Sequence, residues 1–136
     1  MNDKEFAEVK AKIKALVDKW VFVMGLKWYE IDIAYKMGDA ESRGDGFICT
    51  AMCHSRWMYR SATLTIWVEE LPEDPYKLEK LIVHELCHIL VEPMRGRVVT
   101  DKEEYVVESL ARAFMWTDEF ARPKTLKPKS KKKLDK

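Results

Sequence analysis

The chain has 136 residues, of which 47% are hydrophobic and 35% charged, and its formal net charge is +1. This size and composition fit one soluble globular domain. The apolar runs fall short of the roughly 20 residues that span a bilayer, and charges spread through residues 1–14 argue against a secretory signal. The cysteines, Cys49, Cys53 and Cys87, are odd in number and scattered, so no disulfide framework is expected. We therefore expect a cytoplasmic protein without a membrane partner.

Charge is distributed unevenly along the chain. Residues 122–136 hold eight basic residues and one acidic residue, which leaves 16 basic and 22 acidic residues in 1–121. A basic, proline-containing segment of this kind cannot build a core of its own. We expect a single domain over 1–121 and a flexible basic tail over 122–136. The tail is either a solvated end, a contact for nucleic-acid phosphates, or a segment that folds onto the acidic body and covers a cleft.

The first half of the chain changes from a helical to an alternating pattern. Apolar residues recur at helical spacing in 2–20, and Gly25 follows as a stop signal. Residues 37–46 are rich in turn formers and are expected to form a loop. Three segments carry strand patterns: 28–35, 47–54 and 59–68. The last two are expected to form a hairpin that turns near residues 55–56.

The second half returns to helical spacing. Asp74 followed by Pro75 is typical of a helix start, and Pro93 must end that helix. After a short loop over 94–99, Thr100 and Glu103 have the spacing of a capping box at the start of another helix. The two helices are expected over 75–90 and 101–116. The order predicts an α+β fold, with an N-terminal helix and a small three-stranded, mostly antiparallel sheet on which the two later helices pack.

The first of these helices contains the sequence HELCH. His84 and His88 are four residues apart, so both imidazoles lie on one face of a helix and can meet at one metal ion. Glu85 is one step round the helix, where its carboxylate can reach a water molecule bound to that ion. The motif therefore predicts two metal ligands and a general base.

Chance is a poor explanation for this motif. The chain has only three histidines, and the helix around the pair is apolar on nearly every side. Burial of two imidazoles and a carboxylate is costly unless something satisfies them. The sequence therefore favours a metal site over two surface histidines.

The third metal ligand is less evident. No histidine follows His88, and His54 lies near the hairpin turn, where a partly exposed residue without a metal role is the more common case. The second motif helix offers three carboxylates, those of Glu103, Glu104 and Glu108. Glu103 looks committed to the capping box, while Glu104 and Glu108 lie four residues apart on one face. Both can instead be solvated charges at the edge of that face.

HELCH followed by a glutamate-bearing helix resembles the gluzincins, and the size and element order resemble the minigluzincins, which are single-domain zinc metallopeptidases. The match covers about residues 59–116. The register of EYVVESLA implies that Glu104 is the third ligand, followed by Leu110 and Ala111 at the family's apolar and small positions. Glu108 occupies the position from which the family's Asp or Asn supports a histidine. Latency is known among minigluzincins, which makes a contact of the basic tail with the cleft an expectation as well.

The resemblance also implies a mechanism. One zinc ion per chain would be held by His84, His88 and Glu104, and Glu85 would take a proton from the zinc-activated water and pass it to the leaving amine. The peptide substrate would pair with the strand 63–68. The donor that stabilises the oxyanion is open among four residues: Tyr59, Arg97, Tyr105 and Arg112. Two alternatives remain, a non-catalytic metal-stabilised binding module and a nucleic-acid-associated protein that acts through the tail.

Overall fold

The structure is a computed structural model, and it describes residues 1–38, 41–42, 48–94 and 100–122. The helices are α1 (Asp3–Val23), α2 (Pro75–Val91) and α3 (Asp101–Ala121). The strands are β1 (Glu30–Lys36), β2 (Glu41–Ser42), β3 (Ile48–Cys49), β4 (Ala51–Arg56) and β5 (Ser61–Trp67). Three 3₁₀ turns span Trp57–Tyr59, Val68–Glu70 and Glu92–Met94. The loop expected over 94–99 and the basic tail lie almost wholly outside the described residues.

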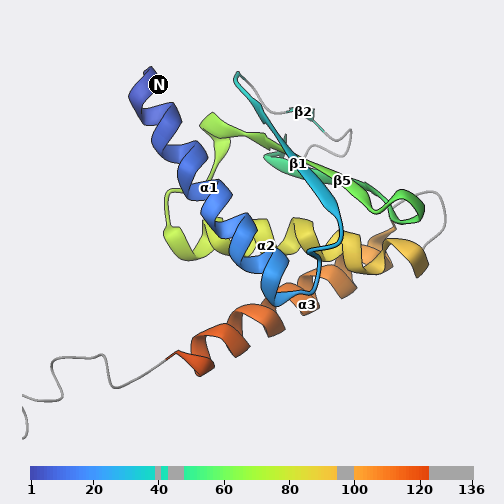
Figure 1. Ribbon diagram of the computed structural model, residues 1–136. Helices are drawn as coiled ribbons and strands as arrows, with labels where there is room; N and C mark the ends of the chain where they lie inside the picture. Colours follow the sequence, from blue (N-terminus) through green and yellow to red (C-terminus); the bar gives the residue numbers. More distant parts are fainter. Residues whose placement is uncertain (39–40, 43–47, 95–99, 123–136) are drawn as a thin grey trace, which may run out of the picture.

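The main sheet has three strands in the order β1-β5-β4 (Figure 1). β1 is parallel to β5, whereas β4 is antiparallel to β5. β2 and β3 form a separate two-stranded antiparallel pair. The α+β class is therefore confirmed, but the expectation of a mostly antiparallel sheet is wrong, because one of the two strand contacts in the main sheet is parallel.

This strand order also removes one expected role of β5. Since β5 is the central strand, its backbone pairs with β1 on one side and β4 on the other. A substrate cannot add a strand to 63–68, so the prediction of peptide pairing there is wrong. The outer strands of the main sheet are β1 and β4.

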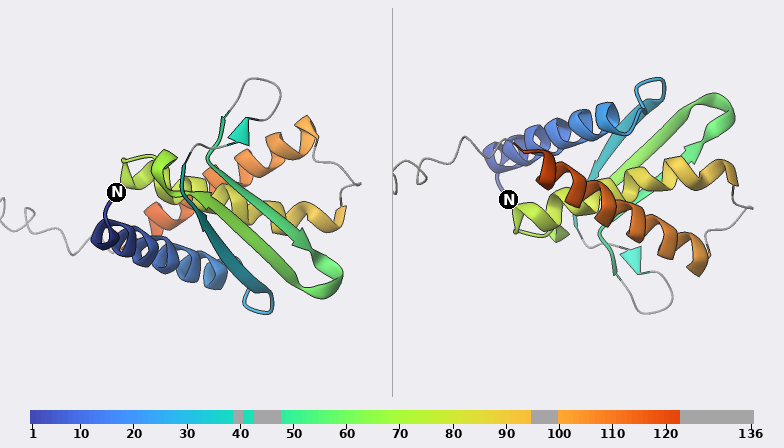
Figure 2. Two further views of the ribbon diagram at one scale, coloured as in Figure 1. Left: turned by 90° about the horizontal axis from the view of Figure 1, so that it is seen from above. Right: turned by 90° about the horizontal axis from the view of Figure 1, so that it is seen from below.

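The helices lie on one side of the sheet, with α2 against the sheet and α3 on the far side of α2 (Figures 1 and 2). α2 packs against β4 and against α1, and α3 packs on α2. α3 therefore lies beyond α2 rather than directly on the sheet, unlike the expected arrangement. The shared core is apolar and draws on all three helices and the sheet; its fully buried members include Ile13, Trp20, Leu64, Ile66, Ile82, Leu86 and Val107.

Both motif helices start where the sequence predicts, although the Asp74 side chain makes no capping hydrogen bond at the start of α2. α2 begins at Pro75 and ends at Val91, where a 3₁₀ turn that contains Pro93 follows. At the start of α3, the Thr100 hydroxyl accepts a hydrogen bond from the Glu103 N–H at 3.2 Å. Within the described ranges, no helix is long and apolar enough to cross a membrane.

An ion-pair network joins the three helices. Lys19 on α1 donates to Glu79 on α2 at 2.8 Å and to Asp118 on α3 at 3.0 Å. The indole N–H of Trp20 donates to the same Glu79 carboxylate at 2.7 Å. These contacts fix α1 against the pair of helices that carries the HELCH motif and the glutamates of α3.

Candidate metal centre

The contact between α2 and α3 brings together the three residues predicted as metal ligands. His84, His88 and Glu104 each offer one ligand atom, and these atoms lie within 4.8 Å of one another. The two Glu104 oxygens lie 3.6 Å from His84 Nε2 and 3.0 Å from His88 Nε2. This group could hold a metal ion.

The helical backbone explains why these side chains meet. His84 and His88 are one turn apart on α2, and their ring centroids are separated by 5.3 Å. Glu104 lies in the first turn of α3, whose start is fixed by Thr100. The Thr100 cap therefore sets the position from which Glu104 faces both imidazoles.

Two further carboxylates contact the opposite ring nitrogens. His84 Nδ1 lies 3.0 Å from Glu108 Oε1, and His88 Nδ1 lies 2.6 Å from Glu103 Oε2. An ionised carboxylate can only accept a hydrogen bond, so each histidine donates through Nδ1–H. In a neutral imidazole this leaves a lone pair on Nε2, and both Nε2 atoms face Glu104.

This arrangement fits a cation between the three side chains. The Nε2 lone pairs and the Glu104 oxygens are all hydrogen-bond acceptors, and two acceptors 3.0 Å apart repel each other unless a proton or a metal ion lies between them. Ligands at about 2.0–2.1 Å from a tetrahedral zinc ion lie about 3.3 Å apart. The separations of 3.6 Å to one Glu104 oxygen and 3.0 Å to the other are close to that spacing, and one ligand atom from each residue lies within 4.8 Å of the other two.

Glu103 has a role that the sequence did not reveal. Its backbone N–H is bound by Thr100, as the capping box predicts, but its side chain contacts His88 instead of returning to the cap. The side chain is nearly buried, with 7% of Glu103 exposed. The position of Glu103 in the sequence could have predicted this contact. Glu103 directly precedes the predicted ligand Glu104, and a step of 100° round the helix keeps both side chains near α2.

Glu108 lies where the sequence register put it, and its carboxylate has three partners. One oxygen contacts His84, and the other accepts hydrogen bonds from Lys80 at 2.5 Å and from Arg112 at 3.2 Å. Burial by itself would raise the pKa of Glu108, but the hydrogen bonds from Lys80 and His84 outweigh it and lower the pKa. Glu108 therefore stays ionised and keeps its hold on His84 Nδ1–H.

The remaining motif residues of α2 are buried. Glu85 is 7% exposed, and Cys87 is fully buried. Burial, reinforced by the negative charges of Glu108 and Glu85, raises the pKa of the Cys87 thiol to about 12. Cys87 is not part of the group His84, His88 and Glu104 that could hold a metal ion.

Other residues considered from the sequence lie outside this group. His54 is exposed on β4 and does not join the three ligand atoms. Among the possible oxyanion donors, Tyr59 and Tyr105 are exposed, and Arg112 is held by Glu108. Arg97 lies outside the described residues.

No protein-family model matches the chain, and neither a curated protein nor a solved structure matches it. The resemblance to minigluzincins therefore stays a prediction from the sequence motif.

Proposed function

We propose that this chain is a zinc-dependent metallopeptidase that hydrolyses peptide bonds with Glu85 as the general base. One observation carries the proposal: the two Nε2 atoms face the oxygens of Glu104 across gaps of 3.0 and 3.6 Å, an arrangement of acceptors that calls for a cation. The choice of zinc comes from the HELCH motif, in which two histidines four residues apart on a helix bind zinc and the glutamate between them acts as a base.

Each residue then has a defined task. A zinc ion at this centre would act as a Lewis acid and supply a nucleophilic water at neutral pH. Glu103 and Glu108 hold the Nδ1 protons of the histidines, which keeps both Nε2 lone pairs directed at the centre. Glu85 accepts a proton on its carboxylate and returns it to the leaving amine.

The number of ligands favours catalysis over a purely structural site. Structural zinc sites usually have four protein ligands, whereas catalytic sites have three and leave one position open. In the described part of the chain, three residues form the group. Glu85 directly follows the first histidine of the motif, which is where a zinc peptidase of this pattern needs its general base.

The substrate in this proposal is a peptide or protein held beside β4. β4 is the outer strand that packs on α2, and Glu92 at the end of α2 ties the two elements together. Its carboxylate accepts from the Ser55 hydroxyl at 2.9 Å and from the Trp57 N–H at 3.0 Å. Three further expectations stay predictions from the sequence: that the tail covers the cleft, that the tail contacts nucleic acid, and that the protein is cytoplasmic.

The test compares zinc-loaded wild type with Glu85→Gln, each as the full chain and as a chain that ends at residue 122, so that latency caused by the tail is detected. Cleavage of a peptide library is followed by mass spectrometry. We expect Glu85→Gln to be at least about 100-fold slower than wild type, with the same zinc content and melting temperature. Glu119→Gln, at an exposed position near the end of α3, is the matched control.

Two results would contradict the enzyme assignment. Equal cleavage by wild type and Glu85→Gln would show that a contaminating protease is responsible. Loss of fold or of zinc in Glu85→Gln would assign that carboxylate to the structure of the site, as in a metal-stabilised binding module.

A further inference from the structure

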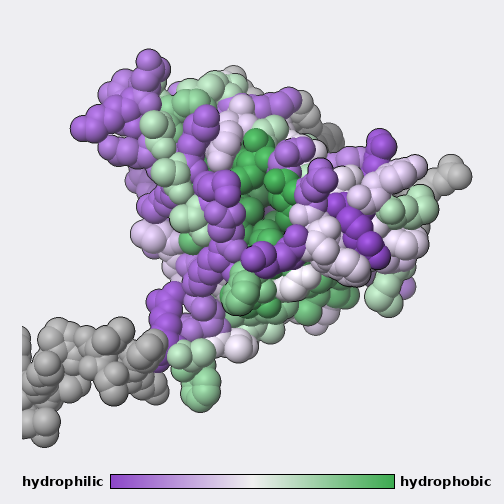
Figure 3. All heavy atoms as spheres, in the orientation of Figure 1, coloured by the Kyte–Doolittle hydropathy of each residue, from purple (hydrophilic) through white to green (hydrophobic). Residues whose placement is uncertain are grey.

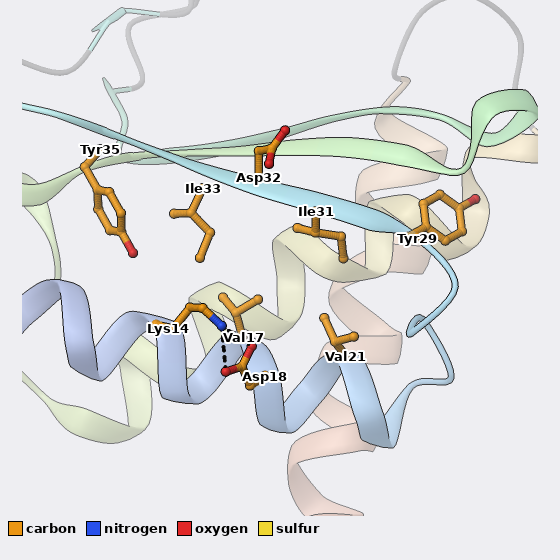
Figure 4. A pocket seen from close by; sticks show the side chains of 9 residues that line it. All are labelled: Lys14, Val17, Asp18, Val21, Tyr29, Ile31, Asp32, Ile33 and Tyr35. Carbon is orange, nitrogen blue, oxygen red and sulfur yellow. Dashed lines mark hydrogen bonds and ion pairs between the residues drawn. The ribbon is translucent and has the colours of Figure 1, made fainter.

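A groove of about 360 Å³ lies between α1 and the outer strand β1, away from the metal centre (Figure 4). Apolar side chains of β1 point into it, and Lys14 and Asp18 of α1 form an ion pair at its rim at 2.8 Å. Figure 3 shows the same region as a hydrophobic hollow bordered by hydrophilic residues. The β1 side chains Ile31, Ile33 and Tyr35 are only half-buried, although each belongs to the face that packs on α1.

The backbone of β1 also presents pairing groups at this edge. The Glu30 N–H donates to the Arg60 carbonyl at 2.8 Å, and in a parallel ladder every second residue faces the same neighbour. The even-numbered residues of β1 therefore face β5, whereas the amides of Ile31, Ile33 and Tyr35 face outward. In the described part of the chain, β1 pairs with β5 alone. The edge strand and the groove below it form one continuous docking surface.

We propose that β1 of a second copy of this chain covers this surface, antiparallel to the first and centred on Ile33. In this register Ile33 lies opposite Ile33 of the other copy, and Ile31 lies opposite Tyr35. All outward amides and carbonyls then have partners, because the three outward residues pair only with one another. The half-buried apolar side chains of both copies come together over the two grooves.

The charges of β1 favour a second copy over an unrelated peptide. At the two ends of the paired segment, Glu30 of one copy lies opposite Lys36 of the other, so the strand EIDIAYK is complementary to itself. A shift of register by two residues leaves one end of each strand unpaired and breaks both Glu30–Lys36 pairs. Lys14 and Asp18 add one charge of each sign to the same edge in each copy.

The pairing would join two three-stranded sheets into one sheet of six strands. It uses the edge opposite to β4, and β4 is the outer strand that packs on α2. The metal centre between α2 and α3 therefore stays accessible in both copies. The association is independent of the proposed peptidase function and can be tested on the metal-free protein.

The test is the molar mass in solution, measured by light scattering over a range of concentrations. Wild type is expected at about twice the 16.0 kDa of one chain. Glu30→Lys places lysine opposite lysine at both ends and should weaken association at least about tenfold. The double variant Glu30→Lys/Lys36→Glu restores opposite charges and should restore the dimer. Glu119→Lys, an exposed site on α3, makes the same charge change away from β1 and should leave the dimer unchanged.

Amide hydrogen exchange supplies a second readout. In the dimer the amides of Ile31, Ile33 and Tyr35 should become protected as concentration rises, whereas in a monomer they exchange rapidly. A wild type that is monomeric at all concentrations would overturn the proposal. So would a dimer that Glu30→Lys leaves intact, or protection of these amides only when an extended peptide is added.

Discussion

The contact between α2 and α3 and the contact between α1 and β1 each leave some groups without a suitable partner, and the groups differ. Between α2 and α3, two imidazoles and three carboxylates, those of Glu103, Glu104 and Glu108, lie within hydrogen-bonding or ligand distance. Between α1 and β1, apolar side chains remain half-covered, and an ion pair lies at the rim. The first contact has too many acceptors facing one point, and the second has too much apolar surface facing water.

The difference teaches what kind of partner each contact requires. A cluster of acceptors is relieved by a small cation, which needs only lone pairs at the right spacing. An open edge with apolar side chains below it is relieved by a strand, which brings both backbone groups and side chains. The predictions below test whether each part of the molecule responds to its own kind of partner and not to the other.

Loss of a ligand should have the largest effect. His88→Ala removes one of the three ligand atoms, and we expect zinc affinity to fall by more than the 10–100-fold that is typical of outer partners. His54→Ala is the matched control, because His54 is exposed on β4. Zinc content after dialysis and affinity from chelator competition measure both. Equal zinc binding by His88→Ala and His54→Ala would show that zinc does not bind between α2 and α3.

Removal of zinc should destabilise the fold measurably. A ligand present at about 100 times its Kd stabilises the native state by about 2.7 kcal/mol, which is roughly 10 °C in Tm for a domain of this size. We therefore expect EDTA to lower the Tm of the wild type by about that amount. The Tm of His88→Ala should not respond to zinc or EDTA. A zinc response retained in that variant would show that zinc binds elsewhere, for example at cysteine side chains.

The outer carboxylates should have a smaller effect on zinc binding. Glu103→Ala and Glu108→Ala each free the Nδ1 side of one histidine, and we expect a 10–100-fold loss of zinc affinity. Glu119→Ala, at an exposed position on the same helix, should bind zinc as wild type does. Chelator competition separates the three. If only Glu108→Ala weakens binding, the contact of Glu103 with His88 serves the fold alone.

The sequence was sufficient for the parts that depend on local spacing. The separation of His84 and His88 by four residues specifies a shared helical face, and the Thr100 cap specifies where α3 begins. Spacing left Glu104 and Glu108 both open as the third ligand, and only the resemblance to the gluzincin register pointed to Glu104. Glu103 was missed because the capping box assigns its backbone correctly and suggests a matching role for its side chain, which in fact contacts His88.

The sheet order could not be read in the same way. A half-buried strand alternates apolar and polar residues whether its neighbour is parallel or antiparallel, so the pattern of 30–36 is the same in both cases. The pairing of β1 with β5, and not with β4, depends on contacts between residues far apart in the chain. For that reason the prediction from the sequence placed β5 at the edge of the sheet, which is wrong. Only the structure shows that β1 is an edge strand.

The smallest expected effect concerns Lys19, which ties α1 to the α2–α3 pair and so links the two regions. Burial by itself would lower the pKa of Lys19, but hydrogen bonds to Glu79 and Asp118 outweigh it and raise the pKa above its usual 10.5. A raised pKa in the native state contributes stability that is fully present below pH 10.5 and is lost as pH rises through the native pKa.

Urea unfolding between pH 9 and about 11.5 should therefore show a decline for wild type that is shallower for Lys19→Met. The Lys19 side chain is 37% exposed, so solvent screening limits the difference to about 1 kcal/mol or less. Lys12→Met, at an exposed position on the same helix, should decline as wild type does, since tyrosine ionisation affects all three proteins alike. Parallel curves for wild type and Lys19→Met would mean that the Lys19 ion pairs contribute nothing measurable to stability. Apolar packing and the hydrogen bond from Trp20 to Glu79 would then hold α1, and with it one side of the groove beside β1, against α2.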